Sequence, residues 1–449
     1  MKILFIYPSN DPSYPLQLGA LSAFIKQKKH QSKLLPLKIV SILEKENFSE
    51  IKNAVKEFHP DYIGFSCYET AFPWIKKISS YIKKYWPKIK IIAGGYYATL
   101  APEEVITFKA IDIVCRGEGE LPLLELFNKP GRTDIQNLWI KKGNHIYKNQ
   151  IRPLIENLDE LPFPDRDMLD YQAQLDLEKK GERTIKVMAT RGCPYFCTYC
   201  SNKYFRELVP NKNMYLRFRT SKNVIDEIKL LKSKYKFEYV GFHDDNLTLN
   251  VKWLKSFAKL YQKHIGLPFY CATRVEYCTN EILSILKKAG CYLLLIGVES
   301  GDEKYRSNMM KRFMTNKATV EAFRRARRMG LLTWSFTMVG LPKENRRMLA
   351  KTIWLNWQCK ADFVMSSIFY PLKGTELGNL CYESGWVNQE KKESITSYAW
   401  DTILDHPILS TPEIRLAKYI NSLTAVRSSL FWELASGRLK NYFLGRGRL

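Results

Sequence analysis

The sequence has 449 residues, about three times the length of a typical domain, which favours two or three domains. Hydrophobic residues make up 45% and charged residues 26%, which excludes a largely disordered chain or a collagen-like fibre. Lysine plus arginine exceed aspartate plus glutamate by 70 − 45 = 25, so we expect anionic partners: phosphorylated substrates, nucleic acid or an anionic membrane surface. The longest strongly apolar stretch, Cys291–Val298, is too short to cross a bilayer, and the N-terminus lacks a signal-peptide pattern. We therefore expect a cytoplasmic protein without a transmembrane segment.

Residues 1–150 alternate apolar runs with helix-like stretches, the pattern of a parallel sheet covered on both faces. The expected strands are Lys2–Tyr7, Tyr62–Ser66, Ile89–Ala93 and Ile111–Cys115, and a helix is expected over Leu16–Lys28. Each strand ends in a loop of small or polar residues, and ligands of open parallel sheets bind beyond those ends. We predict an α/β, doubly wound (Rossmann-like) domain here.

A second region of alternating strands and helices follows an irregular, proline-containing linker at residues 151–180. The strands expected within residues 181–375 are Ile185–Thr190, Tyr239–His243, Phe269–Thr273, Tyr292–Val298, Leu332–Val339 and Phe363–Tyr370. The expected helix caps are Ser221, Asn250, Thr279 and Asn316, with Gly290 and Gly330 as helix ends. Six strand–helix units fit a partial (β/α)6 barrel, since a full eight-fold barrel needs about 250 residues. Residues 376–449 are predicted to form a basic, mostly helical C-terminal region.

Three of the ten cysteines lie close together, directly after the first expected barrel strand. Cys193, Cys197 and Cys200 have the spacing Cys-x3-Cys-x2-Cys, which suits three corners of a cubane iron–sulfur cluster and leaves the fourth iron open. A structural zinc site would need a fourth protein ligand, for which His243 is the candidate. The other seven cysteines are expected to be small buried apolar residues: Cys67, Cys115, Cys271, Cys278, Cys291, Cys359 and Cys381.

This cysteine cluster resembles that of radical S-adenosylmethionine (radical SAM) enzymes. The resemblance implies a [4Fe–4S] cluster on the three cysteines, with S-adenosylmethionine chelating the open iron. The residues that match SAM-binding positions of the family follow successive strands: Asp244, Asp245, Arg274, Glu299, Ser300, Met338 and Gly340. Alone, Asp244 and Asp245 would equally fit a helix-capping pair or an acid–base pair of the glycosidase type, and Glu299 a solvated carboxylate. The sequence does not decide which of the two aspartates meets the methionine amino group.

The first domain and the linker resemble the cobalamin-binding half of a large radical SAM group. A Gly-Gly pair at a strand end lets backbone approach a bulky ligand closely. The implied cobalamin contacts are Ser66, Gly94, Gly95, Thr99, Gly117 and Glu118. The loop Pro8–Gly19 contains no histidine, so the Asp-x-His-x-x-Gly motif for a lower cobalt ligand is absent. Either cobalamin is bound without a histidine below the cobalt, which we expect, or the domain has lost the cofactor.

The resemblance implies a cobalamin-dependent radical SAM enzyme that methylates an unactivated carbon. A one-electron donor of the flavodoxin or ferredoxin type would reduce the cluster, a 5′-deoxyadenosyl radical would remove a hydrogen atom, and methylcobalamin would deliver the methyl group. The sequence assigns no catalytic residue of the protein itself. The alternative enzyme is a radical cyclase or rearrangement catalyst that transfers no methyl group.

An alternative of another class is a basic, metal-stabilised nucleic-acid-binding protein, supported by the net charge and by the arginines of residues 324–328. The same arginines fit the exposed face of a helix whose Val320, Phe323 and Met329 point inward, so we do not expect nucleic-acid binding. No motif selects a small-molecule, lipid or peptide substrate. The last residues, Arg438–Leu449, carry four basic and no acidic residues, which favours an anionic substrate or peripheral membrane contact.

Overall fold

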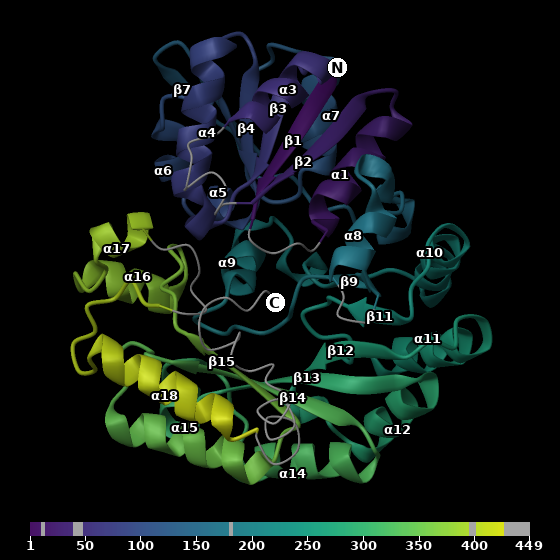
Figure 1. Ribbon diagram of the computed structural model, residues 1–449, viewed down its shortest axis with the longest axis vertical. Coiled ribbons are helices and arrows are strands. Elements are labelled where there is room, and N and C mark those ends of the chain that lie inside the picture. Colours follow the sequence, from purple (N-terminus) through teal and green to yellow (C-terminus); the bar gives the residue numbers. More distant parts are fainter. Residues whose placement is uncertain (10–13, 39–47, 179–182, 395–400, 426–449) are drawn as a thin grey trace. The chain divides into compact units, whose positions relative to one another are not determined.

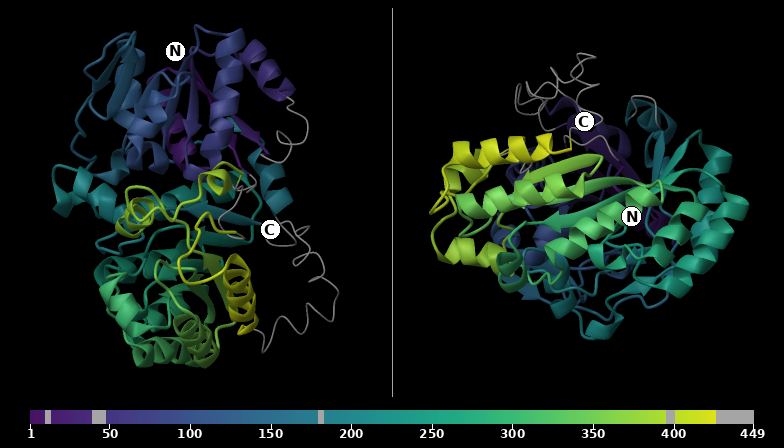
Figure 2. Two further views of the ribbon diagram at one scale, coloured as in Figure 1. Left: turned by 90° about the vertical axis from the view of Figure 1, so that its left-hand side faces the viewer. Right: turned by 90° about the horizontal axis from the view of Figure 1, so that it is seen from below.

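The computed structural model describes residues 1–9, 14–38, 48–178, 183–394 and 401–425 (Figures 1 and 2). The chain divides into two compact units. Unit 1 contains Met1–Gly181, Ser201–Arg217 and Lys373–Thr375, and unit 2 contains Glu182–Cys200, Phe218–Leu372 and Glu376–Leu449. Among the residues described, none of the helices combines the length and apolar character that spanning a bilayer requires.

Unit 1 is built on a seven-stranded sheet with the order β2-β1-β3-β4-β5-β6-β7. Its strands are β1 (Lys2–Pro8), β2 (Gln31–Leu37), β3 (Tyr62–Ser66), β4 (Lys90–Gly94), β5 (Ile113–Cys115), β6 (Leu138–Lys142) and β7 (His145–Lys148). Its helices of five or more residues are α1 (Leu16–Gln27), α3 (Ser49–Phe58), α4 (Phe72–Tyr85), α5 (Tyr96–Leu100), α6 (Pro102–Thr107), α7 (Glu120–Asn128), α8 (Tyr171–Glu178) and α9 (Ser201–Leu208). Strands β1 to β5 are parallel, while β6 and β7 pair antiparallel.

The order 2-1-3-4-5 is a doubly wound arrangement, which confirms the predicted Rossmann-like layout. The chain first builds outward from β1 to β2 and then continues on the other side of β1 with β3, so a switch point lies between β1 and β3. All five residues of β3 are buried, as expected for a strand covered on both faces. Strands β2, β6 and β7 were not predicted from the sequence.

Unit 2 contains a six-stranded parallel sheet with the order β15-β14-β13-β12-β11-β8. The strands are β8 (Thr184–Val187), β11 (Tyr239–Phe242), β12 (Phe269–Thr273), β13 (Cys291–Glu299), β14 (Leu332–Val339) and β15 (Phe363–Ile368). The short strands β9 (Thr190–Arg191) and β10 (Arg217–Phe218) form a separate ladder. The helices are α10 (Ser221–Lys234), α11 (Val251–His264), α12 (Asn280–Ala289), α13 (Glu303–Asn308), α14 (Asn316–Arg328), α15 (Arg346–Cys359), α16 (Glu376–Glu383), α17 (Gln389–Ser394) and α18 (Thr411–Leu423). Each strand of this sheet pairs with the next sheet strand along the chain, with β9 and β10 intervening between β8 and β11, which confirms the partial (β/α)6 barrel.

Helix boundaries follow the capping side chains, with two corrections. Asn250 and Thr279 cap α11 and α12 as predicted, and Gly290 ends α12 in the left-handed conformation. Helix α10 is capped by Thr220 instead of Ser221, and α14 by Thr315 instead of Asn316, because each threonine accepts a backbone N–H. The segment Arg438–Leu449 lies outside the described residues.

Candidate active site

The three clustered cysteines lie in the loop after β9, at the carboxyl ends of the barrel strands. Cys197 is buried, and Cys193 and Cys200 are half-buried. Burial is the main cause that raises the pKa of the Cys193 thiol, to about 11, so this thiol stays protonated until a metal displaces the proton. The other seven cysteines are buried and unpaired, as predicted.

The thiols do not form a mononuclear metal site. Within the described ranges, no three histidine, cysteine, aspartate or glutamate side chains converge as ligands of a single ion. A cubane cluster has no such requirement, because each cysteine binds a different iron. His243, the candidate fourth zinc ligand, instead lies 3.0 Å from the hydroxyl of Tyr270. The donor set thus fits an iron–sulfur cluster better than zinc.

Two buried arginines line the cysteine loop. Arg274, just beyond β12, donates from Nη1 to Cys197 Sγ at 3.6 Å, and its guanidinium stacks on the ring of Tyr195 at 3.6 Å. Its Nη2 donates to Glu276 Oε1 at 2.7 Å. The Nε of Arg274 is buried without a hydrogen-bond partner. A cationic lining of this kind suits an anionic cluster with three thiolate ligands.

The second arginine, Arg312, connects the cysteine loop to the end of β13. Its Nη2 donates to the carbonyl of Gly297 at 2.6 Å, and its Nη1 lies 3.4 Å from the hydroxyl of Tyr199 and 3.6 Å from Glu299 Oε1. Tyr199 stands between Cys197 and Cys200 in the sequence, so Arg312 joins the last cysteines to the end of β13, which carries the predicted SAM residue Glu299. The Nε of Arg312 is also buried without a partner.

The two neighbouring aspartates after β11 have different surroundings. The Asp244 carboxylate is buried and accepts hydrogen bonds from Ala189 N at 2.9 Å, Thr190 N at 2.5 Å and Thr190 Oγ1 at 2.6 Å. Burial raises the pKa of Asp244 to about 6. Asp245 is exposed, and its charge contributes to the raised pKa of Cys193. Asp244 thus fixes the chain that leads into the cysteine loop, while Asp245 is the aspartate accessible beside it.

The end of β13 has an irregular backbone. The pairing register with β14 shifts between Gly297 and Glu299, and Glu299 has a left-handed backbone with φ of 69°. Ser300 is fully buried, and its carbonyl accepts a hydrogen bond from Arg306. The Glu299 carboxylate therefore lies beside Gly297 and Arg312 at the end of β13, while Ser300 is buried.

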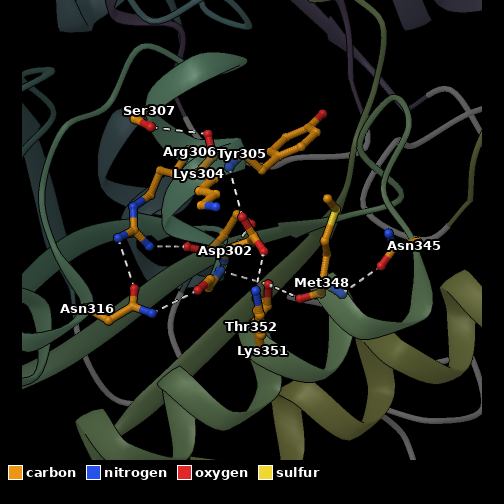
Figure 3. A network of polar contacts seen from close by, with 12 residues as sticks. Asp302, Lys304, Tyr305, Arg306, Ser307, Asn316, Asn345, Met348, Lys351 and Thr352 are labelled. Atoms are coloured by element: carbon orange, nitrogen blue, oxygen red, sulfur yellow. Dashed lines mark hydrogen bonds and ion pairs between the residues drawn. The ribbon is translucent and has the colours of Figure 1, made fainter.

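A polar network fixes this turn against α15 (Figure 3). Gly301 N donates to Thr352 Oγ1 at 2.8 Å, and a Cβ at Gly301 would lie 2.2 Å from the carbonyl oxygen of Lys351. Asp302 accepts Lys351 Nζ at 2.6 Å and the backbone N–H of Tyr305 at 2.9 Å. Only glycine fits at position 301, because any side chain would collide with the backbone of α15.

Arg306 supports the same turn from inside. Its Nη2 donates to Asn316 Oδ1 at 2.9 Å (Figure 3). The same nitrogen donates to the carbonyl of Met314, while Nη1 donates to the carbonyl of Ser300. The side chain is fully buried. Asn316 in turn donates to the carbonyl of Gly301 at 2.9 Å.

The end of β14 carries the last predicted SAM residues. Gly340 has φ of 73°, and its N–H donates to Glu344 Oε2 at 2.7 Å, as does that of Leu341 at 3.1 Å. Burial raises the pKa of Glu344 to about 8. Met338 is half-buried and packs on the apolar cluster around Met310 and Phe369. All seven predicted SAM residues thus lie at or just beyond the carboxyl ends of β11 to β14.

In unit 1, the predicted cobalamin residues meet at the carboxyl ends of β3, β4 and β5. Thr99 Oγ1 donates to the carbonyl of Gly95 at 2.9 Å and accepts the N–H of Gly117 at 3.0 Å. Ser66 Oγ accepts from Gln17 of α1 at 3.3 Å. A Cβ on exposed Gly95, whose φ is 97°, would lie 3.0 Å from the carbonyl oxygen of Cys67. The carboxyl edge of β3 to β5 therefore consists of backbone and small side chains, and such a surface allows a large planar ligand to approach closely.

Glu118 is already paired. Its carboxylate accepts both terminal nitrogens of Arg217, at 2.6 and 3.2 Å, and Arg217 also donates to the carbonyl of Ile155 at 2.6 Å. Asn137 Nδ2 donates to the carbonyl of Glu118 at 2.9 Å. These bonds fix the turn that holds Gly117.

Two family matches divide between these regions: residues 187–354 match the radical SAM superfamily, and residues 9–127 match the B12 binding domain. The chain belongs to the radical SAM family that carries a cobalamin-binding domain. It is 27% identical over 394 residues to an uncharacterized methyltransferase from Pyrococcus horikoshii, covering 84% of this chain and 82% of that protein. It is 24% identical over 345 residues to an anaerobic magnesium-protoporphyrin IX monomethyl ester cyclase from Cereibacter sphaeroides, covering 73% of this chain and 54% of that protein.

The fold of this radical SAM enzyme is also found in a solved structure. The methyltransferase TsrM from Kitasatospora setae, with cobalamin and a [4Fe–4S] cluster bound, superposes with a TM-score of 0.68 at 16% identity, covering 86% of this chain and 79% of that one. The family confirms the expected cofactors, namely the [4Fe–4S] cluster, S-adenosylmethionine and cobalamin. It also favours the radical SAM reading over the nucleic-acid alternative.

Sequence reasoning missed three residues of the radical SAM site. Arg312 lies in an unremarkable basic stretch, and Glu276 and Glu344 resemble ordinary surface carboxylates in the sequence. Their positions depend on contacts with loops from other strands, and no local pattern signals such contacts. The proline before Lys343 and Glu344, after a strand end, was the nearest available hint of a tight turn.

Proposed function

We propose that this radical SAM enzyme is a cobalamin-dependent methyltransferase acting on an unactivated carbon. The observation that carries the proposal is the combination in one chain of a three-cysteine loop at the carboxyl edge of a partial barrel and a B12 domain with an open Gly94–Gly95 edge. When bound, the cluster and the two organic cofactors supply reductive cleavage of S-adenosylmethionine and a transferable methyl group. The family's methyltransferases, including TsrM, support methyl transfer here.

The cysteines 193, 197 and 200 would bind three irons. Asp245 would accept from the methionine amino group, because it is the exposed aspartate next to Cys193. Arg274 would meet the carboxylate, since a guanidinium already adjoins Cys197 and retains an unused Nε–H. Glu299 would accept from the ribose hydroxyls, because its carboxylate lies at the carboxyl end of β13, beside Arg312 of the cysteine-loop lining.

The remaining predicted residues would position these contacts. Asp244 holds the strand before the cysteine loop, Ser300 supports the turn after Glu299, and Gly340 provides a backbone turn at β14. In unit 1, Gly94, Gly95 and Gly117 would offer backbone to the corrin, with Ser66 as a hydroxyl donor, Thr99 as the link between Gly95 and Gly117, and Glu118 as the anchor of the Gly117 turn. The electron would come from a flavodoxin- or ferredoxin-type protein.

The test is anaerobic purification followed by iron, sulfide and corrinoid analysis, with S-[methyl-¹³C]adenosylmethionine and a chemical reductant added. We expect a brown protein with a corrinoid, 5′-deoxyadenosine, and labelled methylcobalamin together with S-adenosylhomocysteine. The variant with Cys193, Cys197 and Cys200 all changed to alanine should lose iron and form no 5′-deoxyadenosine, while its fold, measured by circular dichroism, is retained.

The products distinguish the alternatives. A cyclase or rearrangement enzyme would yield 5′-deoxyadenosine without S-adenosylhomocysteine or labelled methylcobalamin. An unchanged iron content in the triple cysteine variant would refute the proposal, because it would show that these cysteines do not bind the cluster.

A further inference from the structure

Three helices of unit 2 form a strongly basic outer layer. Helices α14, α15 and α18 together carry ten basic and two acidic residues. They lie side by side: Arg327 of α14 donates to the carbonyls of Cys359 and Lys360 at the end of α15. Arg346 at the start of α15 pairs with Glu413 of α18 at 2.6 Å. Figure 1 shows the three helices next to one another along the same side of the barrel.

Large apolar side chains stand out from this basic layer. Trp354 and Trp357 of α15 are 57% and 47% exposed and stack on each other, with ring centroids 4.7 Å apart and planes 20° apart. Three residues apart, they share the outward face of the helix. Solitary exposed aromatics are ordinary on soluble proteins, but a stacked, exposed tryptophan pair is the kind of feature that marks an interaction surface.

Helix α18 also exposes large apolar side chains. Its inward face is Ile414, Ala417 and Asn421, all buried. Its outward face carries Leu416 at 57%, Tyr419 at 42% and Ile420 at 39% exposure. The helix is therefore apolar toward solvent as well as toward the barrel.

We propose that the surface formed by α14, α15 and α18 docks the enzyme on an anionic lipid membrane. Tryptophan prefers the interface between lipid headgroups and hydrocarbon, and exposed leucine and isoleucine gain free energy only where they leave water. The surrounding arginines and lysines are attracted to anionic headgroups. The combination of basic and apolar side chains on helices lying flat at a surface is that of an interfacial contact.

Nucleic acid fits this surface less well. Phosphates would pair with Arg324 and Arg328, but they would leave Leu416 and Ile420 exposed to water. The sequence after α18, residues 426–449, continues the mixed composition with five basic, one acidic and four aromatic residues. The surface lies on unit 2 alone, and the inference is independent of the chemistry proposed above.

The experiment is flotation of the full-length protein with vesicles of equal parts phosphatidylglycerol and phosphatidylcholine, and with vesicles of phosphatidylcholine alone. We expect binding to the anionic vesicles that weakens with salt. Trp354→Ser together with Trp357→Ser should reduce the partition coefficient by about tenfold or more. Arg324→Glu together with Arg328→Glu should reduce it by about tenfold on anionic vesicles.

The matched control is Tyr85→Ser with Lys84→Glu, an exposed aromatic and an exposed lysine on α4 of unit 1, which should bind as the wild type does. Brominated phosphatidylglycerol should quench the tryptophan fluorescence of the wild type, which tests the proposal even if a variant misfolds. Absence of vesicle binding or of quenching, or equal losses in the tryptophan variant and the control, would overturn the proposal. Retention of an oligonucleotide without vesicle binding would identify nucleic acid as the occupant and overturn it as well.

Discussion

Two neighbouring residues, Asp244 and Asp245, have different roles: the first stabilises the fold and the second is proposed to bind S-adenosylmethionine. The Asp244 carboxylate accepts hydrogen bonds from three donors of Ala189 and Thr190. In Asp244→Asn, one carboxylate oxygen is replaced by an NH2 group, which cannot accept them, and the remaining carbonyl oxygen carries no charge. We expect the free energy of unfolding to fall by about 1–3 kcal/mol, measured by urea unfolding of the apoprotein. In Asp245→Asn, at an exposed position, it should change by no more than about 0.5 kcal/mol, while the affinity for S-adenosylmethionine falls.

Each aspartate variant is the control for the other. Equal destabilisation by both substitutions would contradict the assignment of Asp244 to the fold. Unchanged S-adenosylmethionine binding in Asp245→Asn, measured by equilibrium dialysis with the reconstituted cluster, would contradict the assignment of Asp245 to the ligand.

Glu344 predicts a pH dependence of stability. Burial raises the pKa of this carboxyl from 4.5 to about 8, so the folded protein holds a proton that the unfolded chain has released. Its stabilising contribution is therefore complete below about pH 4.5 and is lost as pH rises toward 8. Glu344→Gln keeps an acceptor for Gly340 N and Leu341 N and cannot ionise.

We expect the free energy of unfolding of Glu344→Gln, relative to the wild type, to increase between pH 5 and pH 8, by on the order of 1.4 kcal/mol for each unit of pKa difference. Urea unfolding of the apoprotein at several pH values measures it. A difference that does not vary with pH would mean that Glu344 titrates normally in the folded protein.

At this scale the sequence indicated which residue types gather at the strand ends but not their roles. Asp244 and Asp245 are chemically identical neighbours, and only the fold places the N–H groups of Ala189 and Thr190 against one of them. The role of Arg312 could not be predicted for the same reason, because its partners Gly297 and Tyr199 come from separate segments of the chain.

At the scale of elements, the turn after β13 depends on its contact with α15. A methyl group at Gly301 would lie 2.2 Å from the Lys351 carbonyl, and backbone cannot yield as a flexible side chain can. We expect Gly301→Ala to lower the free energy of unfolding by at least about 3 kcal/mol and to weaken S-adenosylmethionine binding, because Glu299 moves with the turn. Urea unfolding and ligand binding measure the two effects.

Gly94→Ala is the control at another strand end, where the added Cβ would make an ordinary 3.6 Å contact with Cys115. Its free energy of unfolding should stay within about 0.5 kcal/mol of the wild type. If Gly301→Ala were equally stable, α15 would be able to move away from β13.

Three strands have the predicted bounds: β3, β12 and β14. All residues of β3 are buried, and β12 and β14 alternate buried with less buried residues, so each strand has a clear burial pattern between its flanking turns. Strand β7 was missed because none of its residues is buried and so its apolar pattern is weak. Strand β2 lies at the sheet edge and contains Pro36, which argues locally against a strand.

For the whole molecule, the compact units cannot be derived from local pattern, since unit 1 includes Ser201–Arg217 from the middle of the chain. Arg217 is buried and binds Glu118, 99 residues earlier. We expect Arg217→Met to lower the free energy of unfolding by about 3 kcal/mol, because the largely buried Glu118 carboxylate loses its bidentate guanidinium partner. Urea unfolding monitored by fluorescence measures the loss.

Adding Glu118→Gln to Arg217→Met should recover part of the loss, since the glutamine carries no charge that needs a partner. The remainder is then the cost of losing the hydrogen bond to Ile155 and the packing of the guanidinium. A double variant no more stable than Arg217→Met would place the whole effect in those contacts. A single variant as stable as the wild type would mean that the segment Ser201–Arg217 is attached to unit 1 without supporting it.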